Sequence, residues 1–293
     1  MKKYTLLSFV SLVTLLGLLA TDRSQPHVCT HIRSVDLLAD DIPLLAASST
    51  YDINAVRAGR GEVPRIKVTA LSSRKPELTD STPDRKAMFI KAMLPMILQV
   101  NEKILADRMY LTKLMKRSYI QLTDHEKAWV AHMAQRYKVP SPNMRDLLNK
   151  MDIVPPSLAL GQSVEESGWG LSDVAAEKNS PFGQRVSVHK TAADGTTEKL
   201  YKLKTFNSLY AAIEGYIHNI NSHGAYEGLR NKRKAMREQG KTISGYHLAD
   251  GLTKYSELGR VYVRKVQNII LQNELTAFDK ATLNKPSFSN ASL

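Results

Sequence analysis

The chain has a single cysteine among its 293 residues and therefore cannot form a disulfide bond within itself. Internal repeats are also absent, and acidic residues are scarce, with 28 Asp and Glu against 41 Lys and Arg. Without disulfides the fold must rely on its hydrophobic core, and 293 residues are enough to bury one. An apolar content of 43% lies well above the range of disordered proteins, so we expect a globular chain.

The shortage of acidic residues gives the chain a net charge of +13. An excess of this size attracts polyanions, which include nucleic acids, anionic membranes and acidic cell-wall polymers. The charge alone does not distinguish among these partners, so the choice depends on where the protein works.

The start of the chain carries a leucine-rich, uncharged run from Leu6 to Ala20, which follows two lysines and precedes Asp22. This layout is typical of a secretory signal peptide over residues 1–20, and the run is shorter than the roughly 20 apolar residues of a membrane span. Leu18 occupies a cleavage-site position that prefers a small residue, so an uncleaved anchor stays open as an alternative. We therefore expect an exported protein of the periplasm, free or anchored in the inner membrane, and no nucleic-acid partner.

The rest of the sequence divides into three parts. Residues 21–83 show no sustained helical or strand period and predict a largely unstructured, extended linker with one short helix near 35–47. Residues 84–272 carry apolar residues at helical spacing, interrupted between 184 and 206 by an alternating pattern with Asp194-Gly195 as a turn. Residues 273–293 predict a frayed C-terminal tail. The fold class is therefore mainly α, with one small β-hairpin lobe.

The predicted helices have recognisable starts. The first begins near Asp84 and contains Pro95, which can kink or split it. Thr123, with Glu126 three residues later, predicts a capping box. Further helices are expected to start at Ser141, at Ser157 and at Asn207 or Ser208, and a last one covers residues 258–271.

Two adjacent acids, Glu165 and Glu166, end the helix that starts at Ser157 and run into Ser-Gly-Trp-Gly. Because they are rotated by about 100° from each other, one can face a cleft while the other faces solvent or a basic partner. A carboxyl beside the flat apolar face of Trp169 would have a raised pKa and could donate a proton near neutral pH. A leaving glycosidic oxygen needs such a donor, although an acid at a helix end is more often simply solvated.

The wider pattern resembles a known family. ESGWG, NSPFG, GYIHNINSHGAYEGLRNKR and KYSELGRVYVRKV follow one another as in the bacterial Bax family of the glucosaminidase superfamily of peptidoglycan hydrolases. The resemblance covers roughly residues 84–271. It implies a lysozyme-like fold, with a cleft between a helical lobe and a small β lobe. It also implies hydrolysis of the peptidoglycan bond after N-acetylglucosamine, as in an endo-β-N-acetylglucosaminidase, and we expect no cofactor.

The resemblance also implies roles for individual residues. Glu166 matches the general acid of the family. Related hydrolases place a second acid on the hairpin, which makes Glu198 the nearest candidate, although it fits a solvated turn residue as well. Tyr255, a catalytic candidate, and Tyr262 lie in a segment whose tyrosines line the cleft, but Tyr262 also fits a core position. Other expected substrate-binding residues are Gln162, Trp169, Phe182 and Asn179, the last of which would fix its loop through backbone hydrogen bonds. Trp169 fits a core anchor as well as a residue that stacks on sugar.

Histidines and basic residues complete the candidates. His218 and His223 do not share a helical face, so we predict no metal site. Between Arg230 and Lys241 stand six basic residues, with two acidic ones nearby, Glu227 and Glu238. This excess predicts a solvated face that could hold an anionic wall polymer or a membrane surface.

Two other functions fit the same sequence. A lytic transglycosylase on the same fold also uses one Glu and would leave an anhydro-muramyl end. A non-catalytic wall-binding or assembly factor would have kept the cleft and lost its catalytic activity. The lack of a clear second acid points to this function. A nucleic-acid binder fits the charge but conflicts with the leader.

Overall fold

The computed structural model describes residues 40–42, 51–69, 71, 82–140, 143–191 and 196–285. The predicted leader at 1–20, the helix start at Ser141 and the hairpin turn at Asp194-Gly195 lie outside these residues. No helix in the described ranges is both long and apolar enough to cross a membrane.

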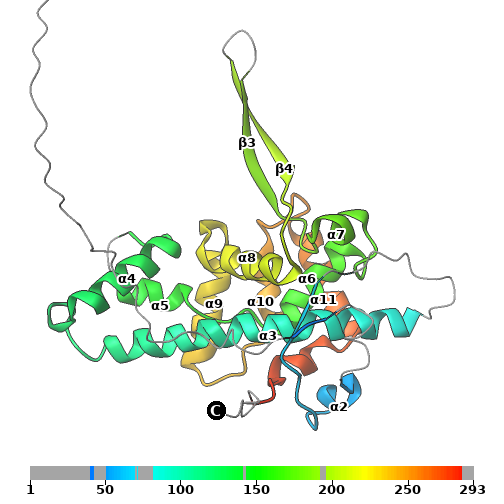
Figure 1. Ribbon diagram of the computed structural model, residues 1–293, viewed down its shortest axis with the longest axis horizontal. Coiled ribbons are helices and arrows are strands. Elements are labelled where there is room, and N and C mark those ends of the chain that lie inside the picture. The colour runs from blue at the N-terminus through cyan, green and yellow to red at the C-terminus, as the bar shows by residue number, and fades with distance from the viewer. Residues whose placement is uncertain are drawn as a thin grey trace, which may run out of the picture. The chain divides into compact units, whose positions relative to one another are not determined.

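The described chain is mainly helical, with four short strands (Figure 1). Strands β1 (Asp40–Ile42) and β2 (Ile66–Val68) pair in parallel, and β3 (Arg185–Thr191) and β4 (Thr197–Leu203) form an antiparallel hairpin. This confirms the predicted class, a helical domain with a small β-hairpin. The helices are α2 (Ile53–Arg57), α3 (Thr82–Leu114), α4 (Asp124–Arg136), α5 (Met144–Lys150), α6 (Pro156–Ser167), α7 (Asp173–Lys178), α8 (Leu209–Ser222), α9 (Glu227–Glu238), α10 (Gly245–Leu248) and α11 (Arg260–Gln272), with 3-10 turns η1 (Tyr119–Gln121), η2 (Gly224–Tyr226), η3 (Ala249–Leu252) and η4 (Leu275–Lys280).

Helix α3 connects the two hydrophobic cores of the domain. Its segment from Phe89 to Ile104 contributes to the main core, whereas Leu111 and Leu114 pack with residues of α4 and α5 in a second cluster. Pro95 is buried within α3 and does not split it into two helices. The predicted capping box at Thr123 is confirmed at the start of α4.

The folded domain extends beyond the predicted limits of 84 and 272. Ile53, Val56 and Val63, from the predicted linker, are buried in the main core, and so is Phe278 from the predicted tail. The described part of the helix expected near 35–47 is strand β1. These segments were missed because they place single apolar residues on an existing core, which leaves no periodic pattern in the sequence.

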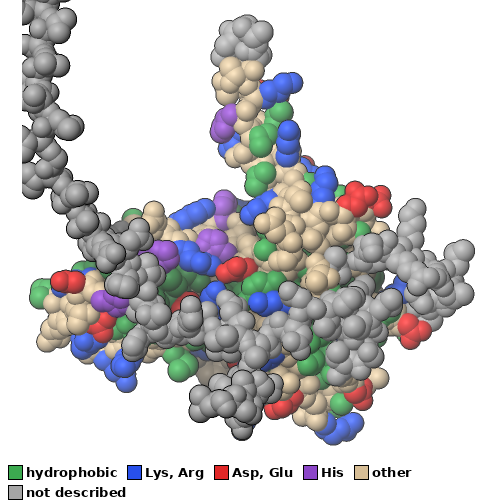
Figure 2. All heavy atoms as spheres, viewed as in Figure 1, with side chains coloured by type: hydrophobic (Ala, Val, Ile, Leu, Met, Phe, Trp, Pro, Cys, Tyr) green, Lys and Arg blue, Asp and Glu red, His purple; other side chains and the backbone are tan. Residues whose placement is uncertain are grey.

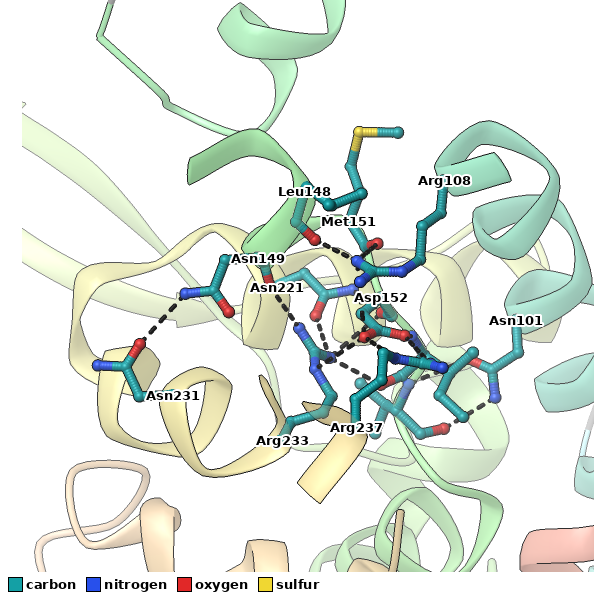
Figure 3. A network of polar contacts seen from close by, with 12 residues as sticks. Asn101, Arg108, Leu148, Asn149, Met151, Asp152, Asn221, Asn231, Arg233 and Arg237 are labelled. Atoms are coloured by element: carbon teal, nitrogen blue, oxygen red, sulfur yellow. Dashed lines mark hydrogen bonds and ion pairs between the residues drawn. The ribbon is translucent and has the colours of Figure 1, made fainter. Parts of the chain in front are cut away.

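A buried carboxylate, Asp152, joins several helices through arginines (Figure 3). Its two oxygens accept from Arg237 at 2.8 and 2.5 Å, and the guanidinium groups of Arg108 and Arg233 lie 3.6 and 3.9 Å away. Burial raises the pKa of Asp152, but hydrogen bonding to Arg237 and the nearby positive charges outweigh it, so the pKa is lowered. Arg233 also donates to the carbonyl oxygen of Ile153 and to Asn221, both at 2.7 Å.

This network corrects the predicted solvated face at 230–241 in part: Lys232, Lys234, Arg237 and Lys241 are exposed as expected, but two of the six basic residues face inward. Arg230 and Arg233 are 3% and 0% exposed, and Arg230 donates to the carbonyl oxygens of Ile220 and His223. The charges of α9 that face inward therefore neutralise Asp152 and satisfy backbone carbonyls. They are not available as a binding surface.

We predict that Asp152→Asn lowers the free energy of unfolding by about 3–5 kcal/mol at neutral pH, because it leaves buried guanidinium groups without their counter-charge. The lowered pKa means that Asp152 stabilises the fold above the unfolded pKa of about 4 and loses this effect as the pH falls through its folded pKa. Urea denaturation should therefore give a difference from wild type that shrinks at acid pH. Asp124→Asn, an exposed control, should cost less than about 1 kcal/mol; equal losses would contradict the prediction.

Candidate active site

Helix α6 carries Glu166 and is buried along most of its length. Its first turn has no cap from its own N-cap residue; instead Asp279 of η4 accepts hydrogen bonds from the backbone N–H and hydroxyl of Ser157 at 2.8 and 2.7 Å. The helix ends at Gly168, whose φ of 57° is left-handed and whose N–H donates to the carbonyl oxygen of Val164. Both ends of the helix are therefore fixed, and Glu166 projects from its last turn.

The Glu166 carboxyl lies against the backbone of Gly183. A Cβ atom at Gly183 would stand 2.8 Å from Glu166 Oε2, and the φ of Gly183 is +59°. The motifs ESGWG and NSPFG are thus brought together, and only glycine allows this approach. Glu166 is half-buried, and burial raises its pKa; the hydrogen bond with Tyr262 lowers the pKa and the charge of Glu165 raises it, leaving it above the ordinary value.

A chain of buried hydrogen bonds leads to Glu166. The Tyr216 hydroxyl donates to Gln162 Oε1 at 2.7 Å, and Gln162 Nε2 donates to the Tyr262 hydroxyl at 3.0 Å. Since the Tyr262 oxygen accepts from Gln162, its own proton is free for its hydrogen bond with Glu166. The chain therefore has one direction, from Tyr216 to Tyr262, and it leaves the Tyr262 proton to act on Glu166, whose pKa it lowers.

A group of aromatic rings supports the loop that carries Gly183. Phe182 stacks on Tyr216 with ring centroids 3.9 Å apart, and the rings of Tyr255 and Tyr262 stack at 5.3 Å. The Tyr255 hydroxyl donates to the carbonyl oxygen of Phe182 at 2.9 Å. Tyr255, expected as a catalytic residue, thus holds the backbone next to Gly183.

Three of the residues that were expected to contact substrate are buried instead. Gln162, Phe182 and Tyr262 are 0%, 1% and 2% exposed. The polar groups of Gln162 are bonded to Tyr216 and Tyr262, and the Phe182 ring is covered by Tyr216. These residues lie beneath the site and position Glu166, because side chains this deeply buried cannot contact a polymer.

Trp169 and Asn179 lie on the loops next to the site. Trp169 is half-buried, and its ring packs edge-on against Phe89 of α3 at 5.8 Å with Lys86 Nζ 5.1 Å from its centroid. This is the position of a core anchor, the alternative to sugar stacking. Asn179 adopts a left-handed φ of 47° and donates to the carbonyl oxygen of Phe206 at 3.4 Å, which confirms its expected loop-fixing bond.

The structure does not bring Glu198 to Glu166. Glu198 is exposed on β4. In the strand register it lies opposite Lys190, which is five residues beyond Arg185 at the base of the hairpin. At about 3.4 Å per residue, this register places Glu198 about 17 Å along the hairpin. Two carboxyls that cooperate in glycoside hydrolysis stand roughly 5–9.5 Å apart, so Glu198 is not a second acid in this arrangement.

Comparison with known proteins identifies the family. Residues 141–275 match the Glucosaminidase family, described as mannosyl-glycoprotein endo-beta-N-acetylglucosaminidase. Protein Bax of Escherichia coli K12 is 32% identical over 204 residues, which cover 66% of this chain and 72% of that protein. The chain belongs to the Bax family of the glucosaminidase superfamily. Its domain is therefore that of a glycoside hydrolase.

Two solved structures are similar to this Bax-family chain. The catalytic domain of the autolysin Auto from Listeria monocytogenes is 15% identical, with a TM-score of 0.37, and the match covers 69% of this chain and 91% of that one. The glycoside hydrolase domain of FlgJ from Salmonella typhimurium is 17% identical, with a TM-score of 0.28, and the match covers 50% and 97%. TM-scores this low carry no argument about the site.

Residues outside the predicted set complete the site of this Bax-family domain. Lys265 of α11 pairs with Glu165 at 2.9 Å, which is the basic partner expected for that acid. Tyr216 was missed because its neighbours Ile213, Ile217 and Ile220 give it the pattern of a core residue. Only its hydroxyl, in an otherwise apolar helix face, signals a polar role.

A metal site is not found among the described residues, which hold no group of three His, Cys, Asp or Glu suited to an ion. His223 Nδ1 accepts from the N–H of Ala225, and His218 packs against the ring of Tyr137. Both histidines have contacts within the fold.

We predict that Gly183→Ala displaces the Glu166 carboxyl and lowers glycosidase activity at least about tenfold. Gly168→Ala is the matched control, because its φ is also left-handed at 57° but a Cβ there would meet nothing within 4 Å. Both variants should lose a similar 1–2 kcal/mol or so of stability from backbone strain. Equal activities of the two variants, measured beside their melting temperatures, would show that the close approach of Gly183 does not matter.

Proposed function

We propose that the protein hydrolyses peptidoglycan at the glycosidic bond after N-acetylglucosamine, as an endo-β-N-acetylglucosaminidase with Glu166 as its single general acid. The observation that carries the proposal is the half-buried Glu166 carboxyl, which lies against the backbone of Gly183 and whose pKa is raised by burial. A carboxyl with a raised pKa keeps its proton to a higher pH than an ordinary acid, which suits proton donation to a leaving oxygen.

The proposed reaction uses Glu166 as its one protein acid. Glu166 donates its proton to the glycosidic oxygen as the bond to the anomeric carbon breaks. Because Glu198 is distant, the attack on that carbon comes from water or from the acetamido oxygen of the substrate. Glu166, now a carboxylate, can then accept a proton from the water that completes hydrolysis. The neighbouring acid, Glu165, forms an ion pair with Lys265 and is given no role in the reaction.

We also propose that the protein is exported to the periplasm and meets peptidoglycan there. The uncharged run from Leu6 to Ala20 supports export, and an uncleaved leader would associate the protein with the inner membrane. The net charge of +13 suits a substrate that carries many carboxylates.

A lytic transglycosylase is the second candidate function. A single protein acid serves both reactions, and the distance of Glu198 from Glu166 favours neither. The two differ in their products, since a transglycosylase leaves an anhydro-muramyl end.

We predict that Glu166→Gln reduces lysis of cell walls at least about 100-fold, because the amide cannot donate the required proton. Glu165→Gln removes an acid one residue away and should keep a substantial part of the activity. Zymography and turbidity assays on purified cell walls, with melting temperatures to confirm folding, make the comparison. If Glu165→Gln is the inactive variant, Glu166 is not the acid.

We predict that Tyr262→Phe moves the alkaline limb of the pH–activity profile to higher pH. The hydrogen bond with Tyr262 lowers the pKa of Glu166, so its loss raises that pKa and keeps the acid protonated to a higher pH. Profiles of kcat/KM for wild type and Tyr262→Phe test this, with Tyr246→Phe as a control outside the chain that should leave the limb in place. A shift to lower pH would contradict the orientation of the chain.

A further inference from the structure

The two faces of the β3–β4 hairpin differ in chemistry. Residues directly opposite one another in an antiparallel pair point to the same face. One face carries Lys190, Glu198 and the apolar residues Val186, Val188 and Leu200, together with Lys202. The other, which we call the Tyr201 face, carries Arg185, Ser187, His189, Lys199 and Tyr201.

The Tyr201 face combines an exposed aromatic ring with cationic side chains. Tyr201 is 62% exposed, and Lys199 Nζ lies 5.4 Å from the centroid of its ring. Arg185 and His189 are exposed on the same face. The acid of the described strands, Glu198, lies on the opposite face, so it does not cancel these charges.

The hairpin stands away from the helical body, and Lys, Arg and His side chains are seen along it (Figures 1 and 2). An isolated two-stranded hairpin is marginally stable in water. All residues of β3 and β4 are exposed or half-buried, so both faces of the hairpin are open to a partner.

The Tyr201 face is continuous with the site of Glu166. A Cβ atom at Gly183 would stand 2.8 Å from Glu166 Oε2, and Arg185, two residues later, begins the face. The charge of Arg185 acts on Glu166 and lowers its pKa, which places the two groups within electrostatic range. A polymer bound at Glu166 can therefore continue onto the hairpin.

We propose that the Tyr201 face is a secondary binding surface for an anionic glycan strand, and that it extends substrate contact from Glu166 along the hairpin. The proposal rests on the proposed function, since peptidoglycan supplies both chemistries that the face fits. The apolar face of a sugar ring stacks on Tyr201, and carboxylates of the peptide stems pair with Lys199 and Arg185.

Two double variants separate this face from its opposite. Lys199→Gln with Tyr201→Ser removes one charge and one exposed apolar side chain from the Tyr201 face. Val186→Ser with Lys202→Gln makes the same kind of change on the other face, where these two residues are paired. Both are made in the full chain with Glu166→Gln, so that binding is measured without hydrolysis, and melting temperatures confirm that each variant is folded.

Sedimentation with purified sacculi then measures the Kd across a salt series. The Tyr201-face variant should bind about tenfold more weakly at low salt, the size expected when a stacking contact and a charge contact are lost. The difference should narrow as salt screens the charge contact. The control variant should stay within about twofold of the parent.

Equal losses from the two faces, or no loss from either, would overturn the proposal. A loss of binding to vesicles of anionic lipid, with sacculus binding unchanged, would also overturn it in favour of a membrane surface. The result is independent of catalysis: if the protein with intact Glu166 fails to lyse walls, the proposed function fails, while the comparison of the two faces still decides where glycan binds.

Discussion

The half-burial of one carboxyl, that of Glu166, against the Gly183 backbone is the constraint on which the rest of the site depends. It brings the end of α6 to the loop before the hairpin. It also raises the pKa of the acid. The supporting residues serve this contact: Tyr255 donates to the carbonyl oxygen of Phe182, and Gln162 holds the Tyr262 hydroxyl, which acts on the pKa of the acid. The site is therefore built by groups that the substrate does not touch.

The excess positive charge of the chain lies in two kinds of place, and it has a different role in each. Inside the domain, Arg108, Arg233 and Arg237 surround Asp152 and join α3 and α9 to the segment before α6. Outside it, exposed cations such as Lys199 remain on the hairpin. The net charge of +13 thus overstates the basic surface, because part of it is buried as structural support.

Local signals predicted what is local in the structure. The capping box at Thr123, the hairpin and the end of α6 follow from residues within a few positions of one another. The orientation of Glu166 could not be predicted, because Gln162 meets Tyr216 and Tyr262 at sequence separations of 54 and 100 residues. Gln162 was wrongly expected to bind substrate for the same reason. Its buried partners, Tyr216 and Tyr262, are distant in the sequence and leave no local pattern around it.

The products of wall digestion test the central claim most directly. Purified protein is incubated with sacculi, and the released muropeptides are analysed by mass spectrometry, with and without borohydride reduction. Hydrolysis after N-acetylglucosamine by Glu166 predicts fragments that end in reducing N-acetylglucosamine and take up two hydrogens on reduction. Fragments that end in anhydro-muramyl groups, which do not react with borohydride, would contradict the account and identify a transglycosylase.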